Sequence, residues 1–338
     1  MENLWRSSPF IGVIGKLGVI LFFVLSGFLI TYLLLAEEQR FKTINIKNFY
    51  FRRMLRIWPL YFLIVLLAFF VLPNIPLFTI PGFEKDMIYD KLPIKLFLYA
   101  IIFPNLAMSF GVVSYVSHVW SIGPEEQFYL IWPFLVRRFR KHRIYLMFAI
   151  IFSYIVIRAL VLQYAHLIIG GTLLEAFWRT FNVDCMAIGG LFAVLLFQKH
   201  YMLRFFLNKY LFWFSCILMI LMIGNGIEIP MLHYEFYAVF FGIIILNFAA
   251  NDQIKISLEN PVFNYLGNIS YGLYMYHPIT ITLAIVVAKS MGYVGSWFLY
   301  PLTILLTILM ASVSYRYYES FFLKFKNRFT NIISGSNP

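Results

Sequence analysis

The chain has 338 residues, of which 62% are hydrophobic, 20% are aromatic and only 12% are charged. A soluble domain is typically about half apolar and a quarter charged, so this composition excludes a soluble protein. Intrinsic disorder is excluded too, because disordered chains are poor in aromatic and β-branched residues. The net charge of +12 therefore indicates basic loops that orient membrane spans, and we expect no nucleic-acid partner.

Nine runs are apolar and long enough, or nearly so, to cross a bilayer as helices, which takes about 20 residues. They cover residues 17–36, 57–72, 119–136, 144–169, 181–197, 211–227, 236–250, 269–288 and 297–315. A tenth run, 94–110, is shorter and contains Pro104 and Asn105. The sequence thus predicts an all-α polytopic bundle, a single membrane-embedded domain over 1–338, with about nine transmembrane helices and one re-entrant or interfacial segment.

The distribution of Lys and Arg predicts the orientation. They are densest in 40–56 and 137–143. Since basic loops remain in the cytoplasm, an even number of crossings must separate these two loops. Spans 57–72 and 119–136 supply two crossings if 94–110 does not cross. Nine crossings then place the N-terminus outside and a short basic tail, 316–338, in the cytoplasm.

The span 119–136 carries a carboxylate in an environment that disfavours charge. Helical spacing places Ser121, Glu125 and Tyr129 on one stripe, with His118 a further turn back. A charge inside the bilayer is costly and marks a functional site or a buried pair. Glu125 therefore acts in chemistry, forms a structural pair with Arg158 of the next predicted span, or does both.

The span 269–288 presents a second polar stripe, formed by Ser270, Tyr274 and His277. Pro278 removes one backbone donor directly after the histidine, and we expect a bend there. A buried histidine often has only a structural role, in which it is hydrogen-bonded. Because His277 has polar neighbours, a functional role and a structural role are about equally favoured.

Other polar residues have simpler interpretations. Asp184 is a candidate functional charge, with pairing to Arg179 near the outer interface as the alternative, and His233 and Glu235 are expected to be solvated at the edge of a span. The two cysteines lie inside apolar runs and give neither a disulfide framework nor a metal site. At the middle of span 17–36, Ser26 and Gly27 predict close helix packing or a kink.

Three arginines, Arg52, Arg53 and Arg56, lie at the cytoplasmic entrance of a predicted helix, shortly before Pro59. Guanidinium groups bind phosphate bidentately, which lysine does less well. Ordinary positive-inside anchoring is the alternative, although anchoring requires no particular geometry. We favour a phosphate-bearing ligand.

Four stretches, in this order, resemble the membrane-bound acyltransferase 3 family, which includes bacterial O-antigen and exopolysaccharide O-acetyltransferases. They are residues 18–31 (GVILFFVLSGFLIT), 49–61 (FYFRRMLRIWPLY), 120–130 (WSIGPEEQFYL) and 269–278 (ISYGLYMYHP). The resemblance implies a ten-helix enzyme of the bacterial cytoplasmic (inner) membrane. Such an O-acyltransferase passes an acyl group, often acetyl, from cytoplasmic acyl-CoA to a hydroxyl of a cell-surface or lipid-linked carbohydrate.

The resemblance also implies roles for single residues, and the polar stripes add further residues to this set. We expect catalysis by Glu125 and His277, donor phosphates on Arg52, Arg53 and Arg56, and a substrate pocket at Ser121, Tyr129, Arg158 and Tyr274. The implied partners are membrane lipid, acyl-CoA as donor substrate, the carbohydrate acceptor and glycan-assembly proteins. No permanently bound cofactor and no metal are expected.

The first helix of the family, which carries an arginine and a histidine, has no counterpart here. Three explanations are open: the start site is assigned too late, the protein is degenerate, or another histidine substitutes for the missing one. We favour the first explanation. Two other functions remain open: a proton-coupled transporter that uses Glu125, Arg158, Asp184 and His277 as a relay, and a non-catalytic membrane binding protein.

Overall fold

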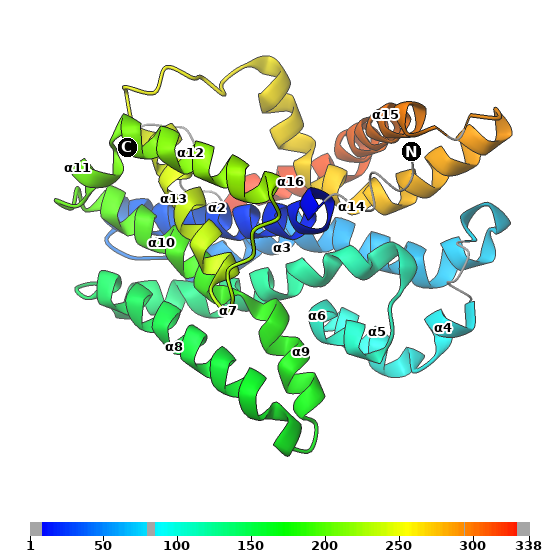
Figure 1. Cartoon of the computed structure of the whole chain (residues 1–338), viewed down its shortest axis with the longest axis horizontal. Coiled ribbons are helices and arrows are strands. Elements are labelled where there is room, and N and C mark those ends of the chain that lie inside the picture. The colour runs from blue at the N-terminus through cyan, green and yellow to red at the C-terminus, as the bar shows by residue number, and fades with distance from the viewer. Residues whose placement is uncertain (1–8, 80–84, 294, 330–338) are drawn as a thin grey trace. The chain divides into compact units, whose positions relative to one another are not determined.

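The computed structural model describes residues 9–79, 85–293 and 295–329, and every regular element within them is helical (Figure 1). The prediction of an all-α membrane protein is therefore confirmed. Seven helical segments are long and apolar enough to cross a membrane. They are Ile14–Phe41, Ile46–Asn74, Arg143–Leu167, Gly171–Phe197, His233–Ala250, Pro261–Ser290 and Ser296–Lys326.

The other two predicted spans also form helices, but shorter ones. Span 119–136 becomes α7 (Ile122–Arg138), with 17 residues, and span 211–227 becomes α12 (Lys209–Gly224), with 16. The run 94–110 is broken into α5 (Leu92–Ala100), α6 (Pro104–Ala107) and a short 3₁₀ turn. None of these three pieces is long enough to cross, which agrees with the prediction that this run does not span the bilayer.

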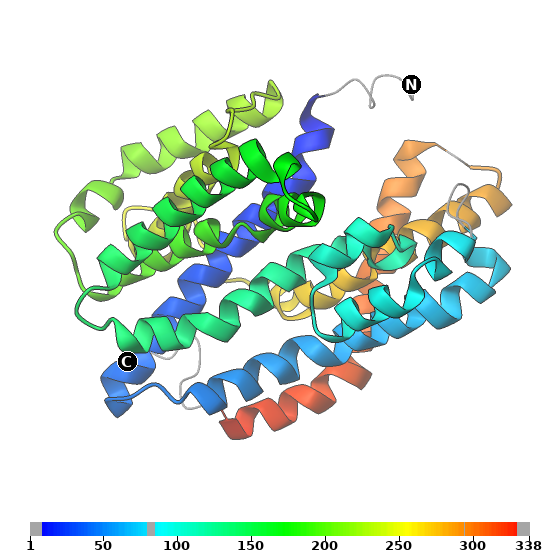
Figure 2. The ribbon, with the colours of Figure 1, turned by 90° about the horizontal axis from the view of Figure 1, so that it is seen from below.

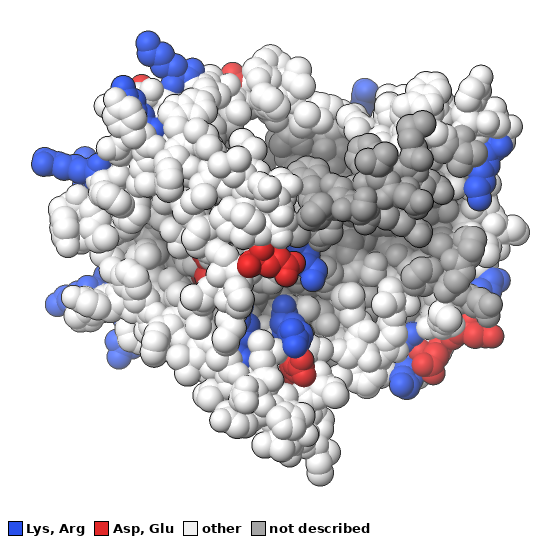
Figure 3. All heavy atoms as spheres, viewed as in Figure 1, with Lys and Arg blue, Asp and Glu red and all other residues white. Residues whose placement is uncertain are grey.

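The surface suits a lipid environment. Charged side chains are sparse on the face drawn in Figure 3. Large apolar side chains point outward along the helices, for example Phe152, which is 70% exposed, and Ile220, which is 69% exposed. In water such exposure would be unfavourable, whereas hydrocarbon chains solvate these side chains. The chain is therefore an integral membrane protein.

The described helices form two compact units. The first unit contains residues 9–44 and 124–256, and the second contains residues 45–123 and 257–329, apart from the undescribed positions. The first unit contains α12 and most of α7. It also comprises α2 (Pro9–Phe41), α8 (Arg143–Tyr164), α9 (Gly171–Phe181), α10 (Val183–Phe197), α11 (Leu203–Phe206) and α13 (His233–Ala250).

The first unit is built around α10, which packs against α2, α8 and α13 (Figures 1 and 2). This helix is apolar on all sides and buried along almost its whole length, as expected for a central helix. Two glycines allow its backbone to touch that of α2. A methyl group at Gly27 would lie 1.9 Å from the Met186 carbonyl oxygen, and one at Gly189 would lie 2.0 Å from the Val24 carbonyl oxygen. The close packing predicted at Ser26 and Gly27 is confirmed.

The second unit is organised around two long helices, α3 (Ile46–Leu66) and α14 (Pro261–Ser290). Asparagine side chains cap both: Asn45 accepts from the Asn48 amide at 3.0 Å, and Asn260 accepts from the Phe263 amide at 3.0 Å. The two helices are joined where the Tyr271 hydroxyl donates to the Ile57 carbonyl at 2.9 Å. The unit also contains α4 (Lys85–Tyr89), α5, α6, α15 (Ser296–Ser314) and α16 (Ser320–Lys326). The predicted basic tail, 316–338, begins with helical structure that includes α16, and its residues 330–338 lie outside the described residues.

The glycine contact predicts a stability effect. Replacement of Gly189 by Ala forces α2 and α10 apart, and we expect it to lower the free energy of unfolding by about 1–3 kcal/mol or more. Gly18→Ala in α2 is the matched control, because nothing lies within 4 Å of its added methyl group. Alanine favours a helix over glycine, so this control should not destabilise the protein. Thermal unfolding in detergent measures both variants, and equal midpoints would contradict the prediction.

Candidate functional site

The first polar cluster surrounds Glu125 in the first turn of α7. Its carboxylate is only 5% exposed and accepts hydrogen bonds from the Ser26 hydroxyl, at 3.0 Å, and from the Tyr129 hydroxyl. Two turns further along α7, the Trp132 indole donates to the Thr31 hydroxyl at 2.8 Å. Glu125 and Tyr129 of the predicted stripe therefore face α2, whereas Ser121 lies before α7 begins. Hydroxyl donors and the N-terminal end of a helix both stabilise an ionised carboxylate.

Ser26 was missing from the predicted site. The sequence shows it only as a small residue in the middle of a span, where it favours helix packing. Ser26 lies beside the carboxylate because the neighbouring Gly27 lets α2 pack closely against α10. This contact depends on tertiary packing.

The second polar cluster lies in the second unit and contains His277. The Nδ1 atom of His277 lies 2.6 Å from the Tyr274 carbonyl oxygen, one turn earlier in α14. A carbonyl can only accept, so Nδ1 carries a hydrogen, and in the neutral imidazole Nε2 then keeps the lone pair. This tautomer is the one that a general base requires at Nε2.

Two predicted pocket residues join this histidine. The Ser121 and Tyr274 hydroxyls are 2.7 Å apart, and the Tyr274 hydroxyl donates to the His118 carbonyl oxygen. Ser270, the third member of the predicted stripe, is exposed and bonds to the Gly267 carbonyl of its own helix. The buried polar stripe of α14 is thus shorter than the sequence indicates.

His118 is a further member of the second cluster. It ends up in the 3₁₀ segment Ser114–Ser121, with its ring centroid 4.8 Å from that of His277 and 5.1 Å from that of Tyr274. Burial, with a smaller contribution from His277, lowers the pKa of His118 to about 3, so its imidazole is neutral at physiological pH. The sequence places His118 on the polar stripe but gives no sign of a second imidazole beside it, because His277 is far away in the chain.

The predicted phosphate-binding arginines lie together on the first half of α3 and are half-buried. Arg52 donates from Nη1 to the Phe329 carbonyl oxygen at 2.8 Å, and the Arg53 guanidinium lies 5.8 Å from the Phe49 ring centroid. Arg56 interacts electrostatically with Glu319. The three guanidiniums thus lie on one stretch of α3 in the second unit.

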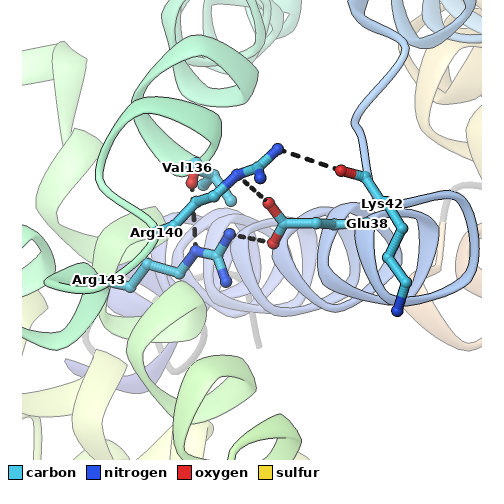
Figure 4. A network of polar contacts seen from close by, with 5 residues as sticks. All are labelled: Glu38, Lys42, Val136, Arg140 and Arg143. Atoms are coloured by element: carbon cyan, nitrogen blue, oxygen red, sulfur yellow. Dashed lines mark hydrogen bonds and ion pairs between the residues drawn. The ribbon is translucent and has the colours of Figure 1, made fainter.

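The other basic loop is used differently. Glu38, near the end of α2, forms ion pairs with Arg140, at 2.5 Å, and with Arg143 (Figure 4). Arg143 also donates to the Val136 carbonyl at 3.2 Å, and Arg140 donates to the Lys42 carbonyl at 3.4 Å. One carboxylate thus holds the end of α2 against the turn between α7 and α8. The basic loop that contains Arg140 and Arg143 therefore stabilises the packing within the first unit.

The predicted pair of Arg158 with Glu125 is wrong. Arg158 instead forms an ion pair with Glu235 of α13 at 2.5 Å, donates to the Met231 carbonyl and lies over the Tyr154 ring. Glu235 is only 6% exposed, so the prediction of a solvated edge residue is also wrong. A guanidinium in low dielectric requires a close carboxylate, and α13 supplies one where α8 and α13 meet.

The predicted pair of Asp184 with Arg179 is wrong as well. Arg179 pairs with Glu175, one turn away on the exposed side of α9. Asp184 is fully buried in the first turn of α10 and interacts electrostatically with Glu235 and Arg158. Asp184 therefore joins a buried charge cluster with these two residues. Among the described residues no group of three His, Cys, Asp or Glu side chains has the geometry of a metal site.

The buried and exposed ion pairs allow a direct comparison. Arg158→Met leaves two buried carboxyl groups without their cation, and we expect about 3–5 kcal/mol of destabilisation. Arg179→Met removes an exposed pair within one helix, which is worth about 0.3–0.5 kcal/mol. Thermal unfolding in detergent distinguishes them, and an Arg158 variant as stable as the Arg179 variant would show that the buried pair is dispensable.

Known proteins resemble the chain over most of its length. A family model described as an acyltransferase domain matches residues 2–316. The O-acetyltransferase OatA of Staphylococcus aureus is 28% identical over 327 residues, which are 90% of this chain and 52% of that protein. The peptidoglycan O-acetyltransferase OatA of Listeria monocytogenes is 37% identical over 134 residues, which are 38% of this chain and 20% of that protein.

The chain thus spans about half the length of the staphylococcal relative and a fifth of the listerial one. No solved structure matches it. The family match includes all four stretches that carry the sequence resemblance, together with the helices that hold both polar clusters and the arginine cluster. The chain belongs to the membrane-bound acyltransferase 3 family.

Proposed function

We propose that this chain transfers an acyl group, in the first instance acetyl, from acyl-CoA to a hydroxyl of a cell-surface carbohydrate. Family membership supports acyl transfer, and the names of the two OatA relatives support acetyl as the group and a glycan as the acceptor. The observation that carries the proposal is the hydrogen bond from His277 Nδ1 to the Tyr274 carbonyl, which leaves Nε2 as the basic nitrogen of a neutral imidazole whose ring lies 5.8 Å from that of Tyr274 between centroids.

The reaction requires one proton to move while one bond forms and another breaks. His277 Nε2 takes the proton of the acceptor hydroxyl, whose oxygen then attacks the thioester carbonyl carbon. The new C–O bond forms, the C–S bond breaks, and the protonated imidazole returns the proton to the departing sulfur. The Tyr274 proton is held by the His118 carbonyl, whereas the Ser121 hydroxyl can rotate away from Tyr274 and donate to the oxyanion that develops on the carbonyl.

Glu125 has a supporting role in this proposal. Its hydrogen bonds to Ser26 and Tyr129 fix the carboxylate and keep it as an acceptor. In this proposal the fixed carboxylate orients an imidazole or stabilises its charged form, which is how carboxylates assist histidine bases in acyl transfer. In the sequence, Glu125 follows Ser121 by one helical turn.

The donor is assigned to the arginine cluster of α3. Acyl-CoA carries several phosphate groups, which match a group of guanidiniums. Since acyl-CoA is made in the cytoplasm and basic loops remain there, we place Arg52, Arg53 and Arg56 at the inner face of the bacterial cytoplasmic membrane, together with the C-terminus.

The proposed base can be tested by one substitution. His277→Gln keeps a polar side chain but removes the basic nitrogen, and we expect acyl transfer to fall by about 10²–10⁴-fold. The exposed His142→Gln is the matched control and should keep wild-type activity. Labelled acetyl-CoA, membranes and candidate glycans, followed by mass spectrometry of the products, give the measurement. Wild-type transfer by a correctly inserted His277→Gln protein would remove this residue from catalysis.

The proposed donor site predicts a different kinetic change. Arg56→Ala removes a charge-assisted hydrogen bond worth about 1.5–3 kcal/mol, so the KM for acetyl-CoA should rise about tenfold or more. The turnover number should change less, because Arg56 does not contact the reacting atoms. Arg138→Ala, an exposed arginine of the other basic loop, should leave the KM unchanged. An unaltered KM for Arg56→Ala would exclude this residue from donor binding.

A second candidate function, proton-coupled transport, rests on the buried cluster of Arg158, Glu235 and Asp184. Two carboxyl groups that share one guanidinium inside a membrane are typical of proton relays. Proton-dependent uptake by the purified protein in liposomes, in the absence of acyl-CoA, would favour transport over acyl transfer.

A further inference from the structure

Helix α14 carries a proline in its interior, directly after His277. Pro278 lies well inside the helix, and the helical structure of α14 continues through it. In an α-helix the N–H of each residue donates to the carbonyl four residues earlier. Proline has no N–H, so position 278 cannot make this bond to the Tyr274 carbonyl. A donor for this carbonyl must therefore come from elsewhere than the backbone of position 278.

The His277 side chain supplies such a donor. Its Nδ1 atom lies 2.6 Å from the Tyr274 carbonyl oxygen, three residues earlier in α14. In a membrane a backbone carbonyl must be satisfied within the protein, and neighbouring side chains commonly do this beside a proline. The bond from His277 thus engages the carbonyl to which an ordinary residue at position 278 would donate.

The backbone around Pro278 is fixed by other side chains of the same helix. The Thr280 hydroxyl lies 3.0 Å from the His277 carbonyl oxygen and 2.6 Å from the Thr307 hydroxyl of α15. The Thr282 hydroxyl donates to the Pro278 carbonyl at 3.2 Å. With the backbone held in this way, the bond between Nδ1 and the Tyr274 carbonyl determines how the imidazole ring is oriented.

This bond also determines where the basic lone pair of the imidazole lies. A neutral imidazole carries one hydrogen, and a hydrogen on Nδ1 leaves Nε2 as the basic nitrogen. Tyr274 is anchored at its other end as well, because its hydroxyl donates to the His118 carbonyl oxygen. One residue therefore holds His277 through its backbone and the segment before α7 through its side chain.

We propose that Pro278 is a positioning residue: because it lacks a backbone N–H, it leaves the Tyr274 carbonyl to His277 Nδ1 and thereby keeps the basic lone pair on Nε2. The proposal rests on the proposed function for the role of Nε2 as the base. Pro278 acts only through His277 and forms or breaks no bond in the reaction. Any other residue at this position would bring back an N–H that competes for the same carbonyl.

The tautomer of His277 gives the first test. Pro278→Ala restores the N–H, so we expect His277 to become a mixture of its two neutral tautomers. Histidine labelled with ¹⁵N reports the tautomer through the chemical shifts of its ring nitrogens, at a pH at which the imidazole is neutral. The spectrum of His277→Gln identifies the His277 signals among those of the six histidines. An unchanged His277 tautomer in Pro278→Ala would overturn the proposal.

The matched control is Pro301→Ala. Pro301 is also a proline inside a helix of the second unit, but the sequence of its helix, α15, contains no histidine. This variant should leave the His277 signals and the turnover number as in the wild type. A shift of the His277 signals in Pro301→Ala equal to that in Pro278→Ala would show a general effect of proline removal and would overturn the specific role of Pro278.

Transfer kinetics give the second test. The net contribution of one hydrogen bond corresponds to a fall in the turnover number of about two- to tenfold for Pro278→Ala. The KM for acetyl-CoA should stay the same, because the proposed donor site lies on α3. Alanine favours a helix over proline, so the variant should remain folded, which its unfolding midpoint in detergent verifies.

A backbone ester separates the missing N–H from the shape of the proline ring. Pro278→lactic acid, introduced by nonsense suppression, has the side chain of alanine but an ester oxygen in place of the N–H. It cannot donate to the Tyr274 carbonyl, so it should keep the wild-type tautomer and a higher turnover number than Pro278→Ala. If the ester variant and Pro278→Ala behave alike in both measurements, the absent N–H is not the cause and the proposal is overturned.

The role of Pro278 and the proposed function fail in different ways. If Pro278→Ala keeps the wild-type tautomer or the wild-type turnover number while His277→Gln is inactive, His277 remains the base and only the role of Pro278 is overturned. If His277→Gln keeps wild-type activity, His277 is not the base, and the role of Pro278 fails together with the mechanism proposed above. A shifted tautomer with reduced turnover in Pro278→Ala, restored in the ester variant, would support the proposal.

Discussion

Every charge that enters the low-dielectric interior of this protein must have a partner there, and this requirement organises much of the structure. Lys95 is fully buried, and its ammonium donates to the carbonyls of Met87 at 2.7 Å and Ile88 at 3.2 Å, which closes the end of α4. Arg158 has Glu235, and Glu125 has two hydroxyl donors. Unpaired burial of any of these groups would cost several kcal/mol, so the helices pack where partners meet.

The contact between α2 and α10 shows how backbone packing serves the site. Gly27 allows the two backbones to touch, and its neighbour Ser26 thereby reaches the Glu125 carboxylate from α2. Small residues are the usual means of close helix approach in membranes, where no hydrophobic force brings helices together. In this chain the same small-residue pair packs one helix and positions a hydroxyl beside a carboxylate.

Local patterns made the helices and the polar stripes predictable. Hydropathy located the long apolar helices, helical spacing placed Glu125 with Tyr129, and the interruption at Pro104 and Asn105 separated the short helices from the spans. The partners across helices were not predictable, because the sequence does not say which helix faces which. Arg158 therefore appeared to need Glu125, although Glu235 of α13 is the partner that the fold brings to it.

The same limit applies to the second cluster. His118 and His277 are adjacent only because the 3₁₀ segment before α7 packs on α14. The sequence separates these two histidines by more than a hundred residues, so their proximity became visible only in three dimensions.

The double ion pair of Glu38 gives two arginines successive tasks. Before the end of α2 has docked, both arginines add their full charge to the loop, which is the property that orients membrane spans. After folding, Glu38 compensates part of this charge, and the exposed Arg137, Arg138 and Lys141 carry most of what remains. The positive charge that this loop presents to its surroundings is thus smaller in the folded protein than in the unfolded chain.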